Sequence, residues 1–292
     1  MNTGKTLYPL SFLLLVVSFP VYAESSVWTV EKNGNTIFLG GTIHLLAESD
    51  YQLPEAYEKA YAGSVEVVLE TDMQKLESPE FQATMMRELR YSNGRNLQQV
   101  VNRDTYRAVE QFFTTRGIPM ANIIGFKPGM VSTMMTMVEL RRLGLVGIGV
   151  DAYFSTKSIN DQKKLGQLET VETQLAFIAN MGAGQADEML IYTLADIERL
   201  PTLMQSIKNA WRRGNMAQLG EVGITPFKNE FPVIHQALLV DRNNAWMPQI
   251  EAMLKTRAVE FVLVGVLHLA GDDGLLAQLA TRGYTVRQLQ AN

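Results

Sequence analysis

Short apolar runs recur along the chain and alternate with segments whose apolar residues follow helical spacing. The first two runs, Val27 to Glu31 and Thr36 to Gly40, flank Lys32-Asn33-Gly34-Asn35. Asn-Gly between two such runs is typical of a tight hairpin turn, so the fold is predicted to open with two antiparallel strands. Four more strands are predicted, at Val65 to Leu69, Lys164 to Leu168, Phe261 to Gly265 and Tyr284 to Leu289.

The segments between these strands are predicted to be helices, because their apolar residues recur every three to four positions. They are Pro54 to Tyr61, Phe81 to Arg90, Asp104 to Thr115, Gly129 to Leu143, Glu172 to Asn180, Ala186 to Asn209, Asn243 to Lys255 and Gly274 to Thr281. Asp104 is expected to cap the third helix. Helices that alternate with strands indicate an α/β fold, and the largely helical stretch from about 80 to 145 is predicted to be a helical lobe inserted into it.

The first segment has the three parts of a secretory signal peptide. Lys5 is followed by the apolar stretch Leu7 to Val21 and then by the small-residue cleavage site Val21-Tyr22-Ala23. We therefore predict that residues 1–23 are removed and that residues 24–292 form one domain in the periplasm or outside the cell. No later apolar run is long enough to span a bilayer, so no transmembrane anchor is expected in the mature chain.

Charge and cysteine content restrict the partners that this domain is expected to bind and the way in which it is stabilised. The formal net charge is −4, and no basic cluster is present that would follow the phosphates of a nucleic acid. We therefore expect no nucleic-acid partner. The sequence contains no cysteine, so the stability of an exported domain would depend on its core and not on disulfides. Nothing in the sequence fixes an oligomeric state.

Two of the three histidines occupy matching phrases, Gly41-Thr42-Ile43-His44 and Gly265-Val266-Leu267-His268, each at the end of an apolar run. Glycine lets the backbone turn or approach a ligand closely, and imidazole binds metals and transfers protons near neutral pH. A single histidine after a strand is more often structural, whereas the repeated phrase favours a functional pair. His235 has no such phrase, and we interpret it as structural.

Carboxylates follow two other predicted strands. Glu70 ends Val-Val-Leu-Glu, and Glu169 ends Lys-Leu-Gly-Gln-Leu-Glu. Because side chains alternate along a strand, Glu70 and Asp72 are expected to point the same way as a pair. Reactive groups gather at strand ends in α/β sheets, and two histidines with carboxylates can hold a cation that activates water. These residues favour hydrolysis, although a lone glutamate at a strand end is ordinarily solvated surface or a helix cap.

Five phrases, in order along the chain, resemble the TraB/GumN family, which includes the bacterial pheromone-shutdown TraB proteins and the animal Tiki proteases. They are the paired Gly-x-x-His phrases, Leu69-Glu70-Thr71-Asp72, Leu168-Glu169-Thr170, Asp241-Arg242-Asn243 with Trp246, and His268-Leu269-Ala270-Gly271 through Gly283-Tyr284-Thr285-Val286. The resemblance covers nearly the whole mature chain. It implies an α/β fold with a mixed central sheet, helices on both faces and a helical insertion, as in erythromycin-esterase and ChaN-like proteins.

The resemblance also implies a metal-dependent peptidase that acts on peptide or protein substrates. His44, His268 and Glu70 are expected to bind the metal, which would be manganese or cobalt, with zinc or iron as alternatives. One departure concerns the helical lobe, because members of the family often carry Lys-Pro-Trp where this chain has Lys127-Pro128-Gly129. The substrate pocket is therefore expected to differ.

The residues carried over as catalytic are Glu70, Glu169 and Arg242. One carboxylate would act as general base on water, and Arg242 would stabilise the oxyanion that forms when water adds to a carbonyl. Three further residues are expected to support the metal ligands or to contact the substrate: Asp72, Asp151 and Asn243.

Two other functions stay open at this point. ChaN-like relatives bind haem or iron, and a pair of histidines at strand ends would suit such ligands without catalysis. Erythromycin-esterase relatives use a similar set of histidine and glutamate residues to hydrolyse esters without metal.

Overall fold

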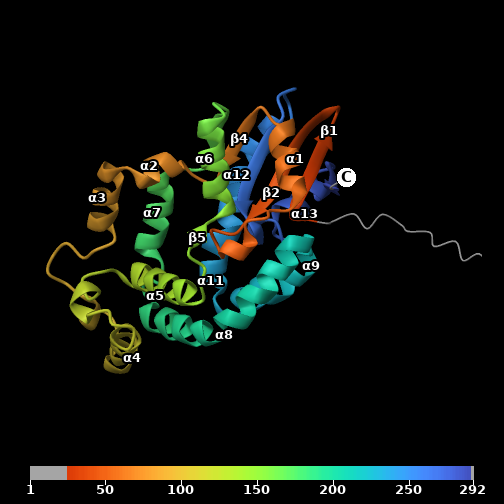
Figure 1. Cartoon of the computed structure of the whole chain (residues 1–292). Coiled ribbons are helices and arrows are strands. Elements are labelled where there is room, and N and C mark those ends of the chain that lie inside the picture. Colours follow the sequence, from red (N-terminus) through yellow and green to blue (C-terminus); the bar gives the residue numbers. More distant parts are fainter. Residues whose placement is uncertain (1–24, 291–292) are drawn as a thin grey trace, which may run out of the picture.

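A six-stranded mixed sheet forms the centre of the protein, seen in a computed structural model that describes residues 25–290 (Figure 1). The predicted signal peptide, residues 1–23, lies outside the described residues. Neighbouring strands in the order β6-β4-β7-β2 are parallel, whereas β1 is antiparallel to both β2 and β8. The strands are β1 (Val27–Lys32), β2 (Asn35–Thr42), β4 (Glu66–Leu69), β6 (Lys164–Gln167), β7 (Glu260–Gly265) and β8 (Thr285–Gln288). The predicted α/β fold with a mixed sheet is therefore confirmed.

The predicted hairpin is also confirmed. Strands β1 and β2 pair from Val27 opposite Gly40 to Lys32 opposite Asn35. The two turn residues, Asn33 and Gly34, have φ angles of 54° and 82°. Both angles lie in the left-handed region that a two-residue hairpin turn requires, and asparagine and glycine adopt it at the least cost.

Helices cover both faces of the sheet. Phe261 and Leu263 of β7 pack into a cluster with α1 (Glu55–Gly63), α6 (Val150–Asn160) and the second half of α8 (Ala186–Arg213). Val262 and Val264 point to the other face, where they meet α12 (Asp241–Met253) and α13 (Leu275–Thr281). Burying one large apolar side chain contributes about 1.5–3 kcal/mol, so apolar residues at successive positions hold β7 between two layers of helices.

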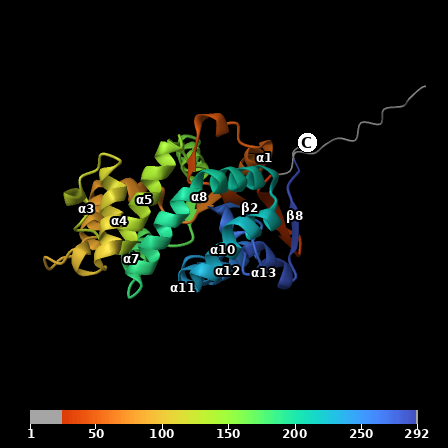
Figure 2. The ribbon, with the colours of Figure 1, turned by 90° about the horizontal axis from the view of Figure 1, so that it is seen from below.

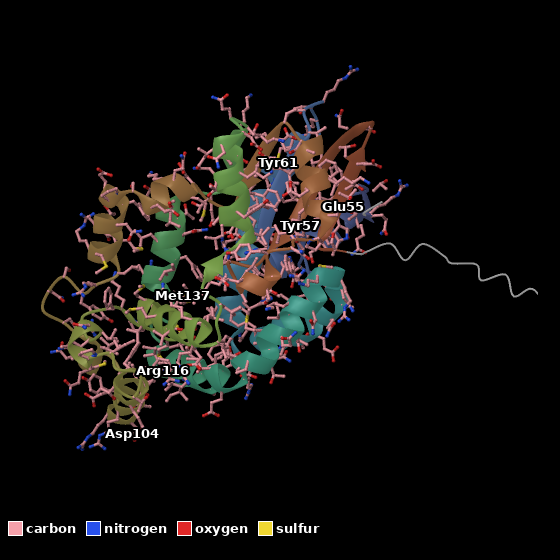
Figure 3. All side chains as sticks on the ribbon, in the orientation of Figure 1. Glu55, Tyr57, Tyr61, Asp104, Arg116 and Met137 are labelled. Atoms are coloured by element: carbon pink, nitrogen blue, oxygen red, sulfur yellow. The ribbon has the colours of Figure 1, made fainter. Side chains whose placement is uncertain are left out.

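A buried polar contact ties α1 and α8 to the end of β2. The indole nitrogen of Trp211 donates hydrogen bonds to the carbonyl oxygen of Gly41 at 2.8 Å and to the hydroxyl of Tyr57 at 2.7 Å. The Tyr57 hydroxyl in turn donates to the same carbonyl. Tyr57 and Tyr61 lie on α1 next to the sheet (Figure 3). The backbone that leads to His44 is therefore held by two aromatic side chains.

The helical lobe has a core of its own beside the sheet (Figure 2). It contains α3 (Pro79–Glu88), α4 (Arg103–Thr114) and α5 (Pro128–Arg142), and its buried cluster also takes in α7 (Val171–Asn180) and the first half of α8. Helix α8 thus runs from the lobe to the sheet and packs against both. Within the lobe, the buried carboxylate of Glu139 is bonded to Arg116 at 2.9 Å.

The predicted cap of α4 is wrong by two residues. The side-chain oxygen of Asn102, not that of Asp104, accepts hydrogen bonds from the backbone N–H groups of Asp104 and Thr105, each at 2.9 Å. Asparagine and aspartate cap helices about equally well, so local preference does not choose between these two positions. Because the first turn of α4 starts at Arg103, the residue before it, Asn102, is in the capping position.

Gly129 explains the departure from the Lys-Pro-Trp pattern. A Cβ atom at this position would lie 2.2 Å from the carbonyl oxygen of Ile178 and 3.0 Å from the Cβ of Met181. The first turn of α5 therefore lies directly against the end of α7, and no larger side chain fits there without moving one helix.

Several short elements were not predicted. Two of them, β3 (Leu45–Leu46) and β5 (Gly147–Ile148), form a small antiparallel pair beside His44. The others lie mostly between α8 and α12 and are α2 (Met73–Glu77), α9 (Met216–Leu219), the π turn η4 (Gly220–Ile224), α10 (Thr225–Glu230), α11 (Pro232–His235) and the π turn η5 (Gln236–Val240). Within residues 25–290, no helix combines the length and the apolar character that crossing a membrane requires.

Candidate active site

Three parallel strands bring the predicted site residues to one edge of the sheet. Strand β7 lies between β4 and β2, and all three run in the same direction. Glu70 directly follows β4, His44 lies two positions after β2, and His268 closes the short helical turn η6 (Val266–His268) after β7. Glu169 follows β6 at the same edge, and α12 supplies Arg242. The two histidines and two glutamates, which the sequence placed at the ends of strands, thus lie together at one edge of the sheet.

Arg242 is the centre of the cluster. One terminal nitrogen, Nη2, donates to Glu70 at 2.6 Å and to Glu169 at 2.7 Å, and Nε donates to Glu169 at 3.2 Å. The other, Nη1, donates to Nε2 of His268 at 3.1 Å and to the carbonyl oxygen of Leu238 at 3.4 Å. Every N–H group of the guanidinium has an acceptor. Arg242 thus holds two carboxylates and one imidazole in place.

His268 is buried and held in one tautomer. Because a guanidinium can only donate, Nε2 of His268 accepts, and the ring proton lies on Nδ1. Nδ1 donates to the side-chain oxygen of Asn243 at 2.7 Å, and Asn243 donates back to the carbonyl oxygen of His268 at 3.2 Å. Burial lowers the pKa of His268 to about 4, so its ring is neutral at neutral pH. Asn243 therefore contacts His268, as expected for a supporting residue.

Glu70 is an ionised, buried carboxylate. Burial opposes its ionisation, but His268, which is protonated in the acid range where Glu70 titrates, acts together with Arg242 and His44 to outweigh burial and lower the pKa of Glu70 to about 2. The backbone N–H of Gly265 adds a hydrogen bond of 2.6 Å. A Cβ on Gly265 would lie 3.2 Å from the same carboxylate oxygen, so glycine allows this close approach.

The two Gly-x-x-His glycines serve different purposes. Gly265 admits the carboxylate of Glu70 to the backbone of β7. Gly41 instead admits a neighbouring side chain, because a Cβ there would lie 2.7 Å from Val266 in η6. The repeated phrase therefore indicates two tightly packed strand ends and not two equivalent ligand sites.

His44 differs from His268 in almost every respect. Its Nδ1 is 2.9 Å from the carboxylate of Asp151, and its side chain is 64% exposed. The charge of Asp151 raises the pKa of His44 to about 9, so the ring is protonated at neutral pH. Its other nitrogen, Nε2, makes no hydrogen bond to another residue in the range 25–290 and lies 3.8 Å from where a Cβ of Gly265 would be, close to Glu70.

Two cavities open beside His44. One, of about 290 Å³, lies against the ends of β2 and β4 and the start of α6. The other, of about 430 Å³, lies under α5, α7 and α12 and is lined by Glu169 and Arg242. Three residues line both cavities: His44, Glu70 and Gln174. Gln174 was not predicted, because nothing in the sequence distinguishes it from other polar residues of its helix.

The expected pair of Glu70 and Asp72 does not form. Strand β4 ends at Leu69, so the alternation of side chains is lost before Asp72. Asp72 instead caps α2, where its side chain accepts a hydrogen bond from the backbone N–H of Lys75 at 3.0 Å. The second carboxylate beside Glu70 is Glu169, which also accepts a hydrogen bond from the indole N–H of Trp246 at 3.1 Å.

His235 stays apart from the cluster, as predicted. It is buried, its ring lies 5.9 Å from that of Phe227, and it lines a different cavity from His44. Burial lowers its pKa.

This arrangement does not fit the predicted metal centre. Within residues 25–290, no group of three or more histidine, cysteine, aspartate and glutamate side chains is placed to hold a metal ion. Nε2 of His268 is occupied by Arg242, and the same guanidinium binds Glu70 and Glu169. Arg242 thus occupies the position of a cation among these three groups. Metal binding by the chain stays a prediction.

The fold and the cluster define an α/β protein with histidine, carboxylate and arginine side chains at the carboxyl edge of its parallel strands. The model of the TraB/PrgY/gumN family matches residues 26–288, nearly the whole chain. The chain belongs to this family. No curated protein and no solved structure matches it.

Proposed function

We propose that the protein is a hydrolase of peptide bonds in which His44 accepts a proton from the attacking water. One observation carries the proposal. His44 is bound through Nδ1 to Asp151, while its free Nε2 lies beside Glu70 at the junction of two cavities. A histidine oriented by a carboxylate on one nitrogen and open on the other is the arrangement that general-base catalysis requires.

The glutamates are less suited to accept the proton. Glu70 has a pKa of about 2, and its oxygens accept hydrogen bonds from Gly265 and Arg242. Glu169 accepts from Arg242 and from Trp246. A base with the low pKa of Glu70 is weak near neutral pH. The proposal therefore gives the glutamates a different role, which is to place negative charge beside the imidazolium that forms on His44.

Arg242 acts as a positioning residue in this scheme. All of its N–H groups already have acceptors, so it can bind an oxyanion only by releasing one of them. Its position fixes Glu70 and Glu169 relative to His44. The expected role of Arg242 as an oxyanion donor stays a prediction.

The proposed reaction has two steps. In the first, the water oxygen bonds to the carbonyl carbon of the peptide, and the water proton moves to Nε2 of neutral His44. In the second, the C–N bond breaks, and the imidazolium returns the proton to the leaving amine. Asp151 stabilises the imidazolium between the two steps, as its hydrogen bond at 2.9 Å favours the charged ring.

The predicted metal-dependent peptidase is the second candidate. It is supported by Nε2 of His44, which has no protein partner among residues 25–290, and by the nearby oxygen of Glu70. Bound manganese or cobalt would supply an acidified water. Export to the periplasm or the exterior, which residues 1–23 predict, would place either enzyme among extracytoplasmic peptides.

The test is an assay of the purified protein on a panel of peptides and simple esters. Samples would be treated with chelator or supplied with manganese. We expect chelator-resistant peptide cleavage that falls roughly 100- to 10,000-fold in His44→Ala. His235→Gln, which changes a histidine outside the cluster, is the matched control and should retain activity.

Three outcomes would count against the proposal. Equal turnover by His44→Ala would remove His44 from the mechanism. Cleavage that requires manganese would favour the second candidate. A haem absorption band in the purified protein, without any hydrolysis, would favour a binding protein.

A further inference from the structure

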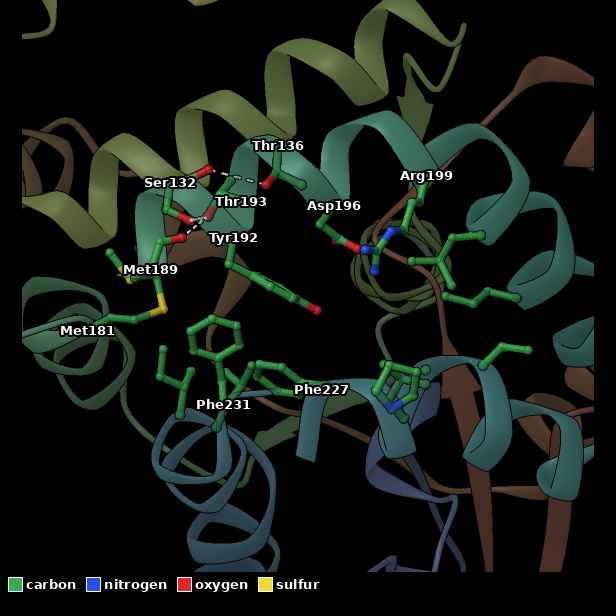
Figure 4. Close-up of a pocket in the computed structure, with 18 residues that line it drawn as sticks. Ser132, Thr136, Met181, Met189, Tyr192, Thr193, Asp196, Arg199, Phe227 and Phe231 are labelled. Carbon is green, nitrogen blue, oxygen red and sulfur yellow. Dashed lines mark hydrogen bonds between the residues drawn. The ribbon is translucent and has the colours of Figure 1, made fainter. Parts of the chain in front are cut away.

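A cavity of about 360 Å³ lies between α8 and the segment that links it to α12 (Figure 4). Its upper wall in the figure is α8, with Ser132 and Thr136 from α5, and its lower wall contains Phe227 and Phe231. Two of its lining residues, Met181 and Leu238, also line the cavity that contains His44 and Arg242. The two cavities are therefore neighbours that share part of a wall.

The shared wall leads directly to the candidate active site. The carbonyl oxygen of Leu238 accepts a hydrogen bond from Arg242. Leu267, which lines the 360 Å³ cavity, immediately precedes His268. A chain bound beside His44 could thus place one side chain in this cavity.

Most of the cavity wall is apolar and aromatic. The rings of Tyr192 and Phe231 meet edge to face with centroids 4.2 Å apart, and Phe227 lies beside them. Methionines at 181 and 189 complete this part of the wall. Such surfaces pack against aliphatic stems, and aromatic faces also attract cations.

The serine and threonine hydroxyl groups in the wall are already hydrogen-bonded within the protein. Thr193 donates to the carbonyl oxygen of Met189 at 2.8 Å, and Ser132 bonds to the Thr193 hydroxyl at 2.8 Å. The hydroxyl of Thr136 donates to the carbonyl oxygen of Ser132 at 3.2 Å. These three hydroxyl groups therefore need no hydrogen bond from a ligand.

Asp196 is the exception. Its half-buried carboxylate lines the cavity and has no hydrogen bond or ion pair with any other residue in the described range 25–290. Burial raises its pKa more than the attraction of Arg199 lowers it. Arg199 also lines the cavity, but it lies 3.9 Å from Glu230, so these two exposed groups largely offset each other. Asp196, Arg199 and Glu230 together therefore leave one net negative charge at the aromatic wall.

We propose that this cavity binds a lysine or arginine side chain of the peptide substrate, with its stem against the aromatic wall and its charged end at Asp196. This inference rests on the proposed peptide hydrolysis. An apolar side chain would fill the cavity but would leave the carboxylate of Asp196 unpaired. An acidic side chain would be repelled by that carboxylate. A basic side chain packs its aliphatic stem against the aromatic wall and pairs its charge with the carboxylate.

The first test is a binding measurement that needs no catalysis. Calorimetry with the purified His44→Ala protein would compare Nα-acetyl-lysine N-methylamide with the norleucine analogue, which lacks the ammonium group. We expect the lysine compound to bind about 10- to 100-fold more tightly. Adding Asp196→Asn should abolish that preference, while Glu198→Gln, an exposed carboxylate on the same helix, should preserve it.

The second test measures kcat/KM on peptides that differ only in lysine, norleucine or glutamate at one position. We expect a preference for lysine that Asp196→Asn removes mainly through KM. Hydrolysis without any preference for a basic residue, or with a preference unchanged by Asp196→Asn, would overturn the inference and leave the proposed function standing. Lysine binding that depends on Asp196, without hydrolysis of any peptide, would support the cavity and contradict the proposed function.

Discussion

Nη1 of Arg242 lies 3.1 Å from Nε2 of His268, so a guanidinium faces the ring nitrogen that the sequence assigned to a metal. The same guanidinium binds Glu70, which was expected to bind the metal, and Glu169, which was expected to be catalytic. Arg242, Glu70, Glu169 and His268 therefore form a buried ion network centred on arginine.

This network makes Arg242 important for stability. Arg242→Met would leave Glu70 and Glu169 as buried charges without their counter-charge, which costs about 3–5 kcal/mol. We expect the free energy of unfolding in urea to fall by that amount. Arg242→Lys should lose less, because it keeps the charge but not the forked geometry.

The control for this prediction is Arg87→Met. Arg87 forms an exposed pair with Glu88, and such pairs contribute about 0–1 kcal/mol. A loss in Arg242→Met no larger than in Arg87→Met would show that the network does not stabilise the fold.

The position of Arg242 also predicts the outcome of metal analysis. After incubation with manganese, cobalt, zinc and iron followed by desalting, the wild-type protein should retain far less than one metal ion per chain, measured by elemental mass spectrometry. Arg242→Met should retain more, because a cation can then replace the guanidinium among three buried acceptors. Near-stoichiometric metal in the wild type that disappears in His268→Ala would instead establish the predicted metal centre.

The sequence predicted which residues gather at the site but not how they are connected. Strand ends placed His44, Glu70 and His268 at one edge, because parallel strands bring their carboxyl ends together. The contact of Arg242 with Glu70, Glu169 and His268 depends on where α12 crosses that edge. That crossing is set by the packing of Trp246 and its neighbours on the sheet. Such long-range packing cannot be predicted from a local sequence pattern.

The failures of prediction have local causes. Asp72 was assigned to the site because the alternation of side chains was extended three residues beyond Leu69, where the strand ends. The segment from α9 to η5 was not assigned, because Pro226 and Pro232 divide it into helices too short to show a period. This segment nevertheless provides one wall of the cavity that contains Asp196.

Acid should destabilise the protein through His268. In the folded state its pKa is lowered from 6.5 to about 4, so between these values only the unfolded chain binds the proton. Stability is therefore full above pH 6.5 and falls as the pH drops towards 4, by about 3 kcal/mol in all. Below about pH 4.5, protonation of Glu70 in the unfolded chain adds to the loss.

Urea unfolding at pH 7 and at pH 5 checks this prediction. The free energy of unfolding should be about 2 kcal/mol lower at pH 5, and the difference should shrink in His268→Gln. His44 acts in the opposite direction, because the stability from its raised pKa is full below pH 6.5 and is already partly lost at pH 7. His268→Gln keeps this contribution, so the difference between the wild type and His268→Gln isolates the effect of His268. Equal stability of the wild type at the two pH values would contradict a neutral, buried His268.

The proton-accepting role of His44 predicts a particular pH dependence of catalysis. Because Asp151 raises the pKa of His44 to about 9, the neutral ring that can accept a proton becomes more abundant as the pH rises to that value. We expect kcat/KM to increase with pH up to about 9 and then to level off. Asp151→Asn should move this midpoint down towards 6.5, the ordinary value for histidine, and lower the plateau. Asp72→Asn, which removes a carboxylate that only caps α2, should leave the midpoint in place. A profile that Asp151→Asn does not shift would show that another group takes the proton from water.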